Sequence, residues 1–371
     1  MTKSIISENS SYWHALDPDP GTFTQLCSKI GAQGIQVEQL SLHKDKFYNF
    51  EPIFGIFLLA KQNSRRLTLK EDGNNSSINN YPIYFLQQTT THNAYAMHAL
   101  LHILLNSDNE IKTSKDLRQF KKLTHALDST VSLINNQALR NANNSLYLPK
   151  KSQQKQIVYH SISYIKYNGY LWELDTFKKS PSKLVACNEY NWLDSVYNLI
   201  YQKQKEDSIS LWAVIEDRNR VYQRKIIEKN YLKRQIEYKL DKYQPNWKSS
   251  NEVTQWEEEY RYAIDHNETN RRGHIRSIDM LNYCHSFNQL PLRIQKNVNL
   301  LLKEQKHNVE DIMEAWIRVQ DDCLRLYASL GNQVEKEDIY RRKQNKYIPF
   351  IRAFIQALYE EGHLQSIITN L

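Results

Sequence analysis

The stretch IVYHSISYIKYNGYLWELD, residues 157–175, contains two runs of alternating apolar and polar residues joined by Asn168-Gly169. Asn-Gly favours a two-residue type I′ turn, so the stretch predicts a β-hairpin. Counting outward from the turn places Ile162 opposite Asp175. His160 and Asp175 are then diagonal neighbours on one face, about 7–8 Å apart at the backbone. We therefore expect the carboxylate to orient the imidazole and to stabilise its charged form.

Neighbouring segments extend this hairpin into a mixed α/β domain. Residues 52–60 form a continuous apolar run, typical of a strand buried on both faces, and residues 210–215 predict another strand. Residues 94–105 carry apolar side chains at helical spacing, and Asn93 is the expected N-cap of that helix. Cys27 falls on an amphipathic helix near the N-terminus, where a free cysteine is usually a small buried hydrophobe.

After about residue 217 the sequence becomes helical. Apolar residues recur there at alternating steps of three and four, a heptad seam expected of a helix that packs lengthwise against a partner. The seam comprises Val309, Ile312, Trp316, Val319, Cys323, Leu326 and Leu330. We expect Gly331 to end this helix, Pro349 to open a shorter helix at its first position, and Gly362 to cap that shorter helix.

Composition limits the class of protein. The 371 residues suggest two domains, and only 9 Gly and 9 Pro argue against collagen-like or low-complexity sequence. No signal peptide is visible, and the longest apolar run, residues 53–60, is far too short to span a bilayer. The four cysteines form no Cys-x-x-Cys pair, which argues against a zinc ribbon or a disulfide framework: Cys27, Cys187, Cys284 and Cys323. We expect a soluble protein of the cytoplasm, the nucleus or both.

Charge and histidine spacing give weaker signals. The net charge is +8, but the basic residues of 218–234 and 341–346 interleave with apolar residues as on solvated helix faces. Nucleic acid is therefore an unlikely partner, and a membrane is not expected. His98 and His102 have the i, i+4 spacing of metal ligands, but no third ligand is evident, so we expect structural roles, no metal and no cofactor.

Short motifs in order along the chain resemble those of a known family. They are DPDPGTFTQL (17–26), GAQGIQVE (31–38), PIFG (52–55), NAYA (93–96), the hairpin with His160 and Asp175, ACN (186–188), Asp217-Arg218 and RRKQNKYIPF (341–350). Together they resemble the ubiquitin carboxyl-terminal hydrolases, the UCH cysteine peptidases of peptidase family C12. The last motif resembles the tail of the long branch of that family, which associates with the proteasome and with chromatin complexes.

The resemblance implies an α/β (α-β-α) fold, with a papain-like central antiparallel sheet flanked by helices and an all-α C-terminal extension. It implies a UCH-like domain over residues 1–225, a charged helical insertion or linker over 226–307, and a helical tail domain over 308–371. Residues 240–305 are not explained by it.

The family's reaction needs a Cys thiolate that attacks the carbonyl at the ubiquitin C-terminus. It also needs a His as base and proton donor, an Asp that orients the His, and a Gln that stabilises the oxyanion. Position by position, the resemblance implies that His160 is the base and Asp175 the orienting carboxylate. The nucleophile position falls on Tyr95 and the oxyanion position on Thr89, with Gln88, one residue earlier, as a candidate substitute.

A phenol has an ordinary pKa of about 10, and its oxygen lies several bonds further from the backbone than a Cys sulfur. The resemblance therefore implies a pseudo-enzyme with a thiol-protease fold in the Ubl conjugation pathway. Its expected partners are ubiquitin or a ubiquitin-like protein and, through residues 308–371, a proteasomal ubiquitin receptor or a chromatin-remodelling subunit. The alternative is an active thiol-dependent ubiquitinyl hydrolase in ubiquitin-dependent catabolism. Its nucleophile would be a cysteine elsewhere in the chain and not the residue at position 95.

Overall fold

The computed structural model describes residues 12–41, 43, 47–61, 82–87, 92–107, 109–126, 133–147, 159–203, 209–256, 258, 296, 309–344 and 347–363. The chain divides into two compact units, which are called the first and the second unit below. The first comprises Met1–Asp217 with Lys343–Leu371, and the second comprises Arg218–Arg342. The three-part division implied by the resemblance stays a prediction, although one helix, α8 (Arg218–Tyr243), runs through residue 225 without a break.

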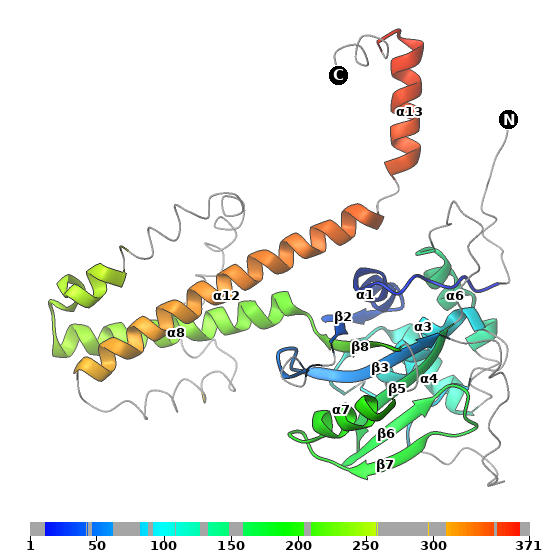
Figure 1. Cartoon of the computed structure of the whole chain (residues 1–371), viewed down its shortest axis with the longest axis horizontal. Coiled ribbons are helices and arrows are strands. Elements are labelled where there is room, and N and C mark those ends of the chain that lie inside the picture. Colours follow the sequence, from blue (N-terminus) through cyan, green and yellow to red (C-terminus); the bar gives the residue numbers. More distant parts are fainter. Residues whose placement is uncertain are drawn as a thin grey trace. The chain divides into compact units, whose positions relative to one another are not determined.

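A six-stranded antiparallel sheet forms the centre of the first unit, in agreement with the predicted α/β class (Figure 1). Its strands in spatial order are β2 (Ile35–Leu40), β8 (Ile209–Glu216), β3 (Ile53–Lys61), β5 (Tyr159–Tyr167), β6 (Tyr170–Asp175) and β7 (Ser182–Ala186). The strands predicted at 52–60 and 210–215 are β3 and β8. Two short strands, β1 (Ala32–Gln33) and β4 (Lys112–Thr113), pair in a separate small sheet.

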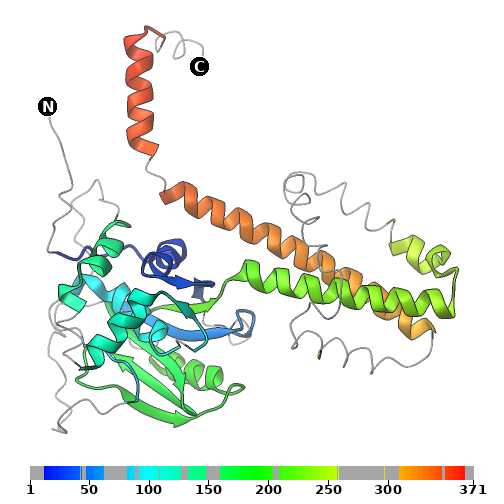
Figure 2. The ribbon, with the colours of Figure 1, turned by 180° about the vertical axis from the view of Figure 1, so that it is seen from behind.

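Helices cover both faces of the large sheet. One face, nearest the viewer in Figure 1, carries α7 (Trp192–Lys203). The opposite face, turned to the front in Figure 2, carries α1 (Pro20–Lys29), α3 (Tyr95–Leu104), α4 (Lys115–Ala126) and α6 (Gln137–Asn144). Leu58 belongs to the apolar core under α7, whereas Leu59 belongs to the core under α1 and α3. Because successive strand residues point to opposite faces, a strand buried on both faces is apolar throughout.

The hairpin of β5 and β6 has the predicted register. Its turn residues Asn168 and Gly169 both have positive φ angles, 48° and 75°, as a type I′ turn requires. Ile162 pairs with Asp175, which is the pairing obtained by counting outward from the turn. Asp175 therefore ends β6 close to the beginning of β5, where His160 lies.

The start of α3 differs from the prediction. A 3₁₀ turn, η1 (His92–Ala94), precedes the helix, and Ala94 is the N-cap, with no capping hydrogen bond from its side chain. The prediction that Asn93 caps this helix is wrong, because its side-chain amide donates instead to the carbonyl of Trp13 at 3.1 Å. The first residue of the helix is Tyr95.

The second unit is a pair of long helices, α8 and α12 (Val309–Gln344), which run side by side in both views (Figures 1 and 2). Five of the seven residues of the predicted heptad seam pack in one core with α8 and a 3₁₀ turn, η2 (Trp247–Ser249): Val309, Ile312, Trp316, Val319 and Cys323. Trp247 and Trp256 both contact Trp316 edge to face, at centroid distances of 5.2 and 5.5 Å. Each of the three indole N–H groups donates to a carboxylate, of Asp241, Asp321 and Glu237 respectively.

Two predicted helix boundaries are wrong and one is confirmed. Gly331 does not end α12, which continues for more than three turns to Gln344. Pro349 is the third residue of α13 (Tyr347–Glu360), not its first, a place that still tolerates proline because the first-turn N–H groups have no helical partner. Gly362 follows α13 with φ 77° and the backbone N–H of His363 donates to Leu358, as in a glycine C-cap. No helix among the described residues is long and apolar enough to cross a membrane.

Candidate active site

His160 and Asp175 form a close pair at the open end of the hairpin. Nε2 of His160 lies 2.5 Å from Oδ1 of Asp175, and both side chains are largely buried, with exposed fractions of 18% and 14%. The ring of Phe177 stacks on the imidazole at 4.1 Å. The stacked Phe177 ring restrains the tilt of the imidazole plane, and the bond to Asp175 restrains its rotation within that plane.

The environment of Asp175 keeps its carboxylate ionised. Burial alone would raise the pKa, but the hydrogen bond and charge of His160, the backbone N–H of Phe177 and the ammonium of Lys178 outweigh it and hold the pKa below its ordinary value. The Phe177 N–H donates to Oδ1 at 3.0 Å. This arrangement suits a carboxylate that orients a histidine, which is the role the resemblance implies.

A second layer of polar contacts holds the loop after Asp175 in place. The hydroxyl of Thr176 donates to the carbonyl of Ser161 at 3.0 Å. The ammonium of Lys178 binds Glu173 at 3.1 Å, and Glu173 also accepts a 2.7 Å hydrogen bond from the buried hydroxyl of Tyr164. The pair of His160 and Asp175 is thus supported from behind by groups on both strands.

Tyr95, which the resemblance places at the nucleophile position, lies fully buried at the start of α3. Its hydroxyl donates to the carbonyl of Leu16, and its ring lies 5.0 Å from the ring of Tyr159. Burial, followed by the nearby Tyr159 and Asp17, raises the pKa of the phenol far above its ordinary value. Within the described part of the chain, no hydrogen bond joins Tyr95 to His160.

The two candidates for the oxyanion position, Gln88 and Thr89, lie outside the described residues, as does Cys284. The three described cysteines are all buried and free. Burial raises the pKa of Cys27 to about 12 and that of Cys323 to about 11, and it also raises the pKa of Cys187. Such thiols stay protonated near neutral pH, so they are poor nucleophiles.

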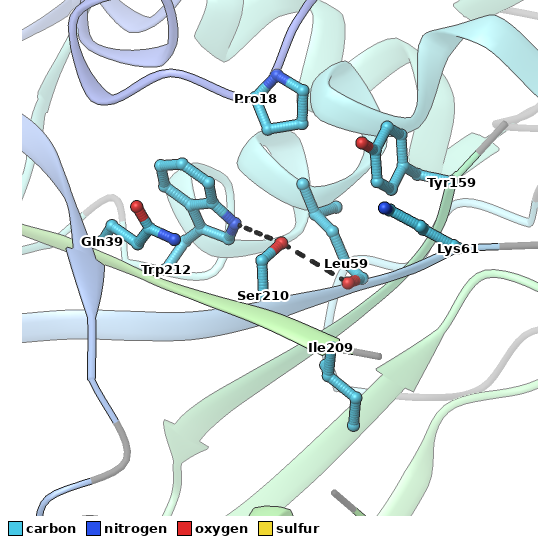
Figure 3. Close-up of a pocket in the computed structure, with 8 residues that line it drawn as sticks. All are labelled: Pro18, Gln39, Leu59, Lys61, Tyr159, Ile209, Ser210 and Trp212. Atoms are coloured by element: carbon cyan, nitrogen blue, oxygen red, sulfur yellow. Dashed lines mark hydrogen bonds between the residues drawn. The ribbon is translucent and has the colours of Figure 1, made fainter. Parts of the chain in front are cut away.

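Figure 3 shows a pocket of about 310 Å³, which is called the pocket beside Tyr95 below because one residue of its lining, Tyr159, contacts Tyr95. Its walls include Tyr159, whose ring contacts Tyr95, and Pro18 from the segment before α1. Lys61 and Gln39 contribute a cation and an amide to its lining, and the Ser210 hydroxyl accepts from the Trp212 indole at 3.0 Å. The remaining lining residues are Leu59 and Ile209.

Sequence reasoning missed this pocket because its residues come from five separate segments. A signal was nevertheless available in the strand alternation. Leu59 and Lys61 on β3, with Ser210 and Trp212 on β8, are two residues apart and must share the face that the predicted helix covers.

The two predicted structural histidines of α3 are fully buried. Nδ1 of His98 lies 2.9 Å from the carbonyl of Ala94, and Nε2 of His102 lies 3.1 Å from the carbonyl of Leu86. Burial lowers the pKa of His98 to about 4, and burial together with the charge of His98 lowers that of His102 to about 3. In the described residues, no group of three or more His, Cys, Asp or Glu side chains could hold a metal ion.

Comparison with known proteins points to one family. The sequence model of ubiquitin carboxyl-terminal hydrolase, family 1, matches residues 13–205. Ubiquitin carboxyl-terminal hydrolase isozyme L5 of Dictyostelium discoideum is 32% identical over 251 residues, which is 63% of this chain and 71% of the relative. The hydrolase ubh-4 of Caenorhabditis elegans is 28% identical over 57% of this chain and 69% of its own length.

Among solved structures, UCH37 of Trichinella spiralis bound to ubiquitin vinyl methyl ester is 28% identical, with a TM-score of 0.46 over 58% of this chain and 86% of that one. The family identification comes from the sequence comparisons. Because the family model spans more than half of the chain, this protein belongs to family 1 of the ubiquitin carboxyl-terminal hydrolases.

Proposed function

We propose that this chain is a member of the family without hydrolase activity, and that it binds ubiquitin. The observation that carries the proposal is the state of Tyr95: its hydroxyl is buried and hydrogen-bonded to the carbonyl of Leu16. The family's chemistry needs an anionic nucleophile beside a histidine. The side chain at this position is instead a neutral phenol whose proton is held by the backbone.

Two physical effects oppose catalysis by Tyr95. Its raised pKa keeps the phenolate population negligible at neutral pH, because ionisation would bury a charge and break the bond to Leu16. His160 is hydrogen-bonded to Asp175 and not to Tyr95 among the described contacts, so no base is placed to remove the phenolic proton. Nucleophilic catalysis requires both groups within hydrogen-bonding reach.

The retained pair of His160 and Asp175 supports descent from an active hydrolase. In the proposed role the pair no longer transfers protons, and its contacts with Phe177 and the Thr176 loop hold the open end of the hairpin. The changes at Tyr95 and at the oxyanion position would then have removed the activity while leaving this side of the site intact.

The proposed binding site for the ubiquitin C-terminal tail is the pocket beside Tyr95. The tail of a substrate must reach the nucleophile position, and the pocket wall formed by Tyr159 touches Tyr95 directly. Aromatic and proline walls with a few polar groups in the lining are suited to an extended peptide. The polar groups here are Lys61, Gln39 and Ser210.

A reactive probe tests the loss of activity. The full chain is incubated with ubiquitin vinyl methyl ester, with UCH37 of Trichinella spiralis, whose structure is bound to this probe, as the positive control, and adducts are located by mass spectrometry. We expect no adduct on the wild-type chain. The Tyr95→Cys variant should acquire a slow adduct, because His160 and Asp175 are already paired. A rapid adduct on any native cysteine would contradict the proposal.

The active alternative makes a specific counter-prediction. If another cysteine is the nucleophile, the wild-type adduct should form at the rate of the positive control and disappear in a single Cys→Ser variant, with Cys284→Ser as the first choice because the described cysteines are buried. In that case Tyr95→Cys should not increase the rate.

A second binding function is proposed for the helical tail. In α13, the apolar side chains of Ile355 and Tyr359 are exposed by 46% and 73%. Exposed apolar side chains on one helix can dock into grooves of partner proteins. The proposed partner is a proteasomal ubiquitin receptor or a chromatin-remodelling subunit. Pull-downs probed for those subunits should lose them with Ile355→Asp but retain them with Gln356→Asp, on the same helix.

A further inference from the structure

Tyr95 contacts one wall of the proposed tail pocket and the chain segment that carries another wall. Its ring packs against Tyr159, which forms one wall, at a centroid distance of 5.0 Å. Its hydroxyl binds the carbonyl of Leu16, two residues before Pro18, which forms another wall. One side chain therefore links two parts of the pocket that lie more than a hundred residues apart in the sequence.

The segment that carries Pro18 is held at both ends. On one side, Tyr95 holds Leu16, and on the other, Asp19 is the N-cap of α1 and accepts from the backbone N–H of Thr22 at 2.9 Å. Between these two anchors Pro18 has little freedom, because proline also fixes its own φ angle. Removal of the first anchor would take away the hydrogen bond that fixes the Leu16 backbone on this side of Pro18; the Leu16 side chain is also buried in the apolar core.

Upstream of Leu16, asparagine side chains fix the same segment. Asn93 donates to the carbonyl of Trp13 at 3.1 Å, and Asn143 donates to that of His14 at 2.8 Å. Asn144 donates to the carbonyl of Tyr12 at 2.7 Å and accepts from the backbone N–H of His14 at 2.9 Å. These hydrogen bonds hold the backbone of residues 12–14, and the hydrogen bond from Tyr95 holds the backbone at Leu16.

Tyr159 is fixed relative to Lys61, another residue of the pocket lining, by strand pairing. Tyr159 is the first residue of β5 and pairs with Lys61 at the end of β3, and both residues line the pocket. The ring of Tyr95 supports the Tyr159 ring from the α3 side. A cysteine at position 95 would end one atom beyond Cβ, too short to hold either the Leu16 carbonyl or the Tyr159 ring as the tyrosine does.

We propose that Tyr95 is the positioning residue of the tail pocket. The side chain that replaces the nucleophile then also orders the surface that binds the ubiquitin tail. This inference rests on the proposed binding function. It reverses the usual expectation for an inactivated hydrolase, because restoration of the cysteine weakens binding.

The test measures binding and local order in the full chain. Affinity for ubiquitin labelled at its N-terminus is measured by fluorescence polarisation for the wild type, Tyr95→Phe and Tyr95→Cys, well below their melting temperatures. Tyr95→Phe keeps the ring and loses only the bond to Leu16, so affinity should fall about fivefold, the equivalent of one net hydrogen bond. Tyr95→Cys loses both contacts, and affinity should fall by at least about tenfold.

The matched control is Tyr327→Phe. Tyr327 lies on α12 in the second unit and is not among the residues that line the pocket, and its hydroxyl accepts a hydrogen bond from the side-chain amide of Asn230 at 3.1 Å. Its loss should lower the melting temperature but leave the affinity for ubiquitin within about twofold of the wild type. Equal affinities for the wild type and both Tyr95 variants would overturn the inference.

Hydrogen exchange in the ubiquitin-free protein separates this inference from the proposed function. The backbone amides of Leu16, Asp17, Asp19 and Tyr159 should exchange faster in Tyr95→Phe, and faster still in Tyr95→Cys, than in the wild type or Tyr327→Phe. If the wild type fails to bind ubiquitin, the proposed function is wrong, while this exchange pattern still supports Tyr95 as the residue that orders the pocket. Unchanged exchange in both Tyr95 variants would refute that role.

Discussion

Acid should weaken the first unit through the two buried histidines of α3. His98 and His102 are both fully buried, and their pKa values in the folded chain are about 4 and about 3, against about 6.5 when unfolded. A histidine whose folded pKa is lowered contributes stability that is complete above the unfolded pKa and is lost as the pH falls below it. The affected window therefore begins near pH 6.5 and extends down to about pH 3.

The size of the effect follows from proton uptake. At about pH 5 both imidazoles are protonated in the unfolded chain and neutral in the folded chain. Each then lowers the free energy of unfolding by roughly 1.5 pH units times 1.36 kcal/mol, or about 2 kcal/mol, and the pair by about 4 kcal/mol. With a urea dependence of roughly 2 kcal/mol per molar, the unfolding midpoint should fall by about 2 M between pH 8 and pH 5.

Urea unfolding followed by circular dichroism at several pH values measures this loss. The double variant His98→Asn with His102→Gln keeps an amide group near the two imidazole nitrogens that contact the backbone, Nδ1 of His98 at the Ala94 carbonyl and Nε2 of His102 at the carbonyl and N–H of Leu86. It should be less stable at pH 8 but should lose most of the slope between pH 8 and pH 5. His43→Gln, at an exposed position, is the control and should keep the slope.

Titration of Asp175 does not contribute to the loss of stability between pH 8 and pH 5. Its pKa is lowered, so its contribution is present above the unfolded value of about 3.9 and is lost only at more acidic pH. An unchanged slope in the double variant would refute the assignment of the pH dependence to the two buried imidazoles.

Other perturbations follow from packing and burial. Cys27, with its pKa raised to about 12, should resist iodoacetamide in the folded chain at about pH 8 and react once urea unfolds it; rapid labelling of the native protein would show that the thiol is accessible. Gly55→Ala places a Cβ 2.8 Å from Ile103, so thermal unfolding should show a loss of about 1–3 kcal/mol. Gly169→Ala meets no atom within 4 Å and should cost only the roughly 1–2 kcal/mol of a positive φ; a larger loss than for Gly55→Ala would contradict this ranking. Trp316→Ala should cost about 3–5 kcal/mol, seen as faster hydrogen exchange in α8, and normal protection there would refute it.

The parts of the fold that the sequence predicted well are those set by local chemistry. Asn168 and Gly169 determine the turn, the turn determines the register, and the register brings His160 to Asp175. The unbroken apolar run of β3 likewise shows a strand that is buried on both faces. In these segments each residue's preference agrees with the final structure, so no distant contact is needed to interpret it.

The errors occur where distant contacts decide. Asn93 is a good N-cap by type, but its amide serves Trp13, eighty residues earlier. Gly331 favours a helix end by about 1 kcal/mol, yet α12 continues through it to Gln344. The pocket beside Tyr95 was not foreseen because no single segment contains it. The assignments of Thr89 and Gln88 to the oxyanion position remain predictions.

The tryptophan cluster of the second unit gives this protein an optical property of its own. Of the chain's seven indoles, those of Trp247 and Trp256 each contact that of Trp316, and each of the three N–H groups is hydrogen-bonded to a carboxylate. Neighbouring chromophores held at fixed angles couple their excited states, which splits their ultraviolet absorption into a pair of circular-dichroism bands of opposite sign. Separation of α8 from α12 would abolish that doublet. Circular dichroism can therefore report whether the two helices are packed together, without an attached dye.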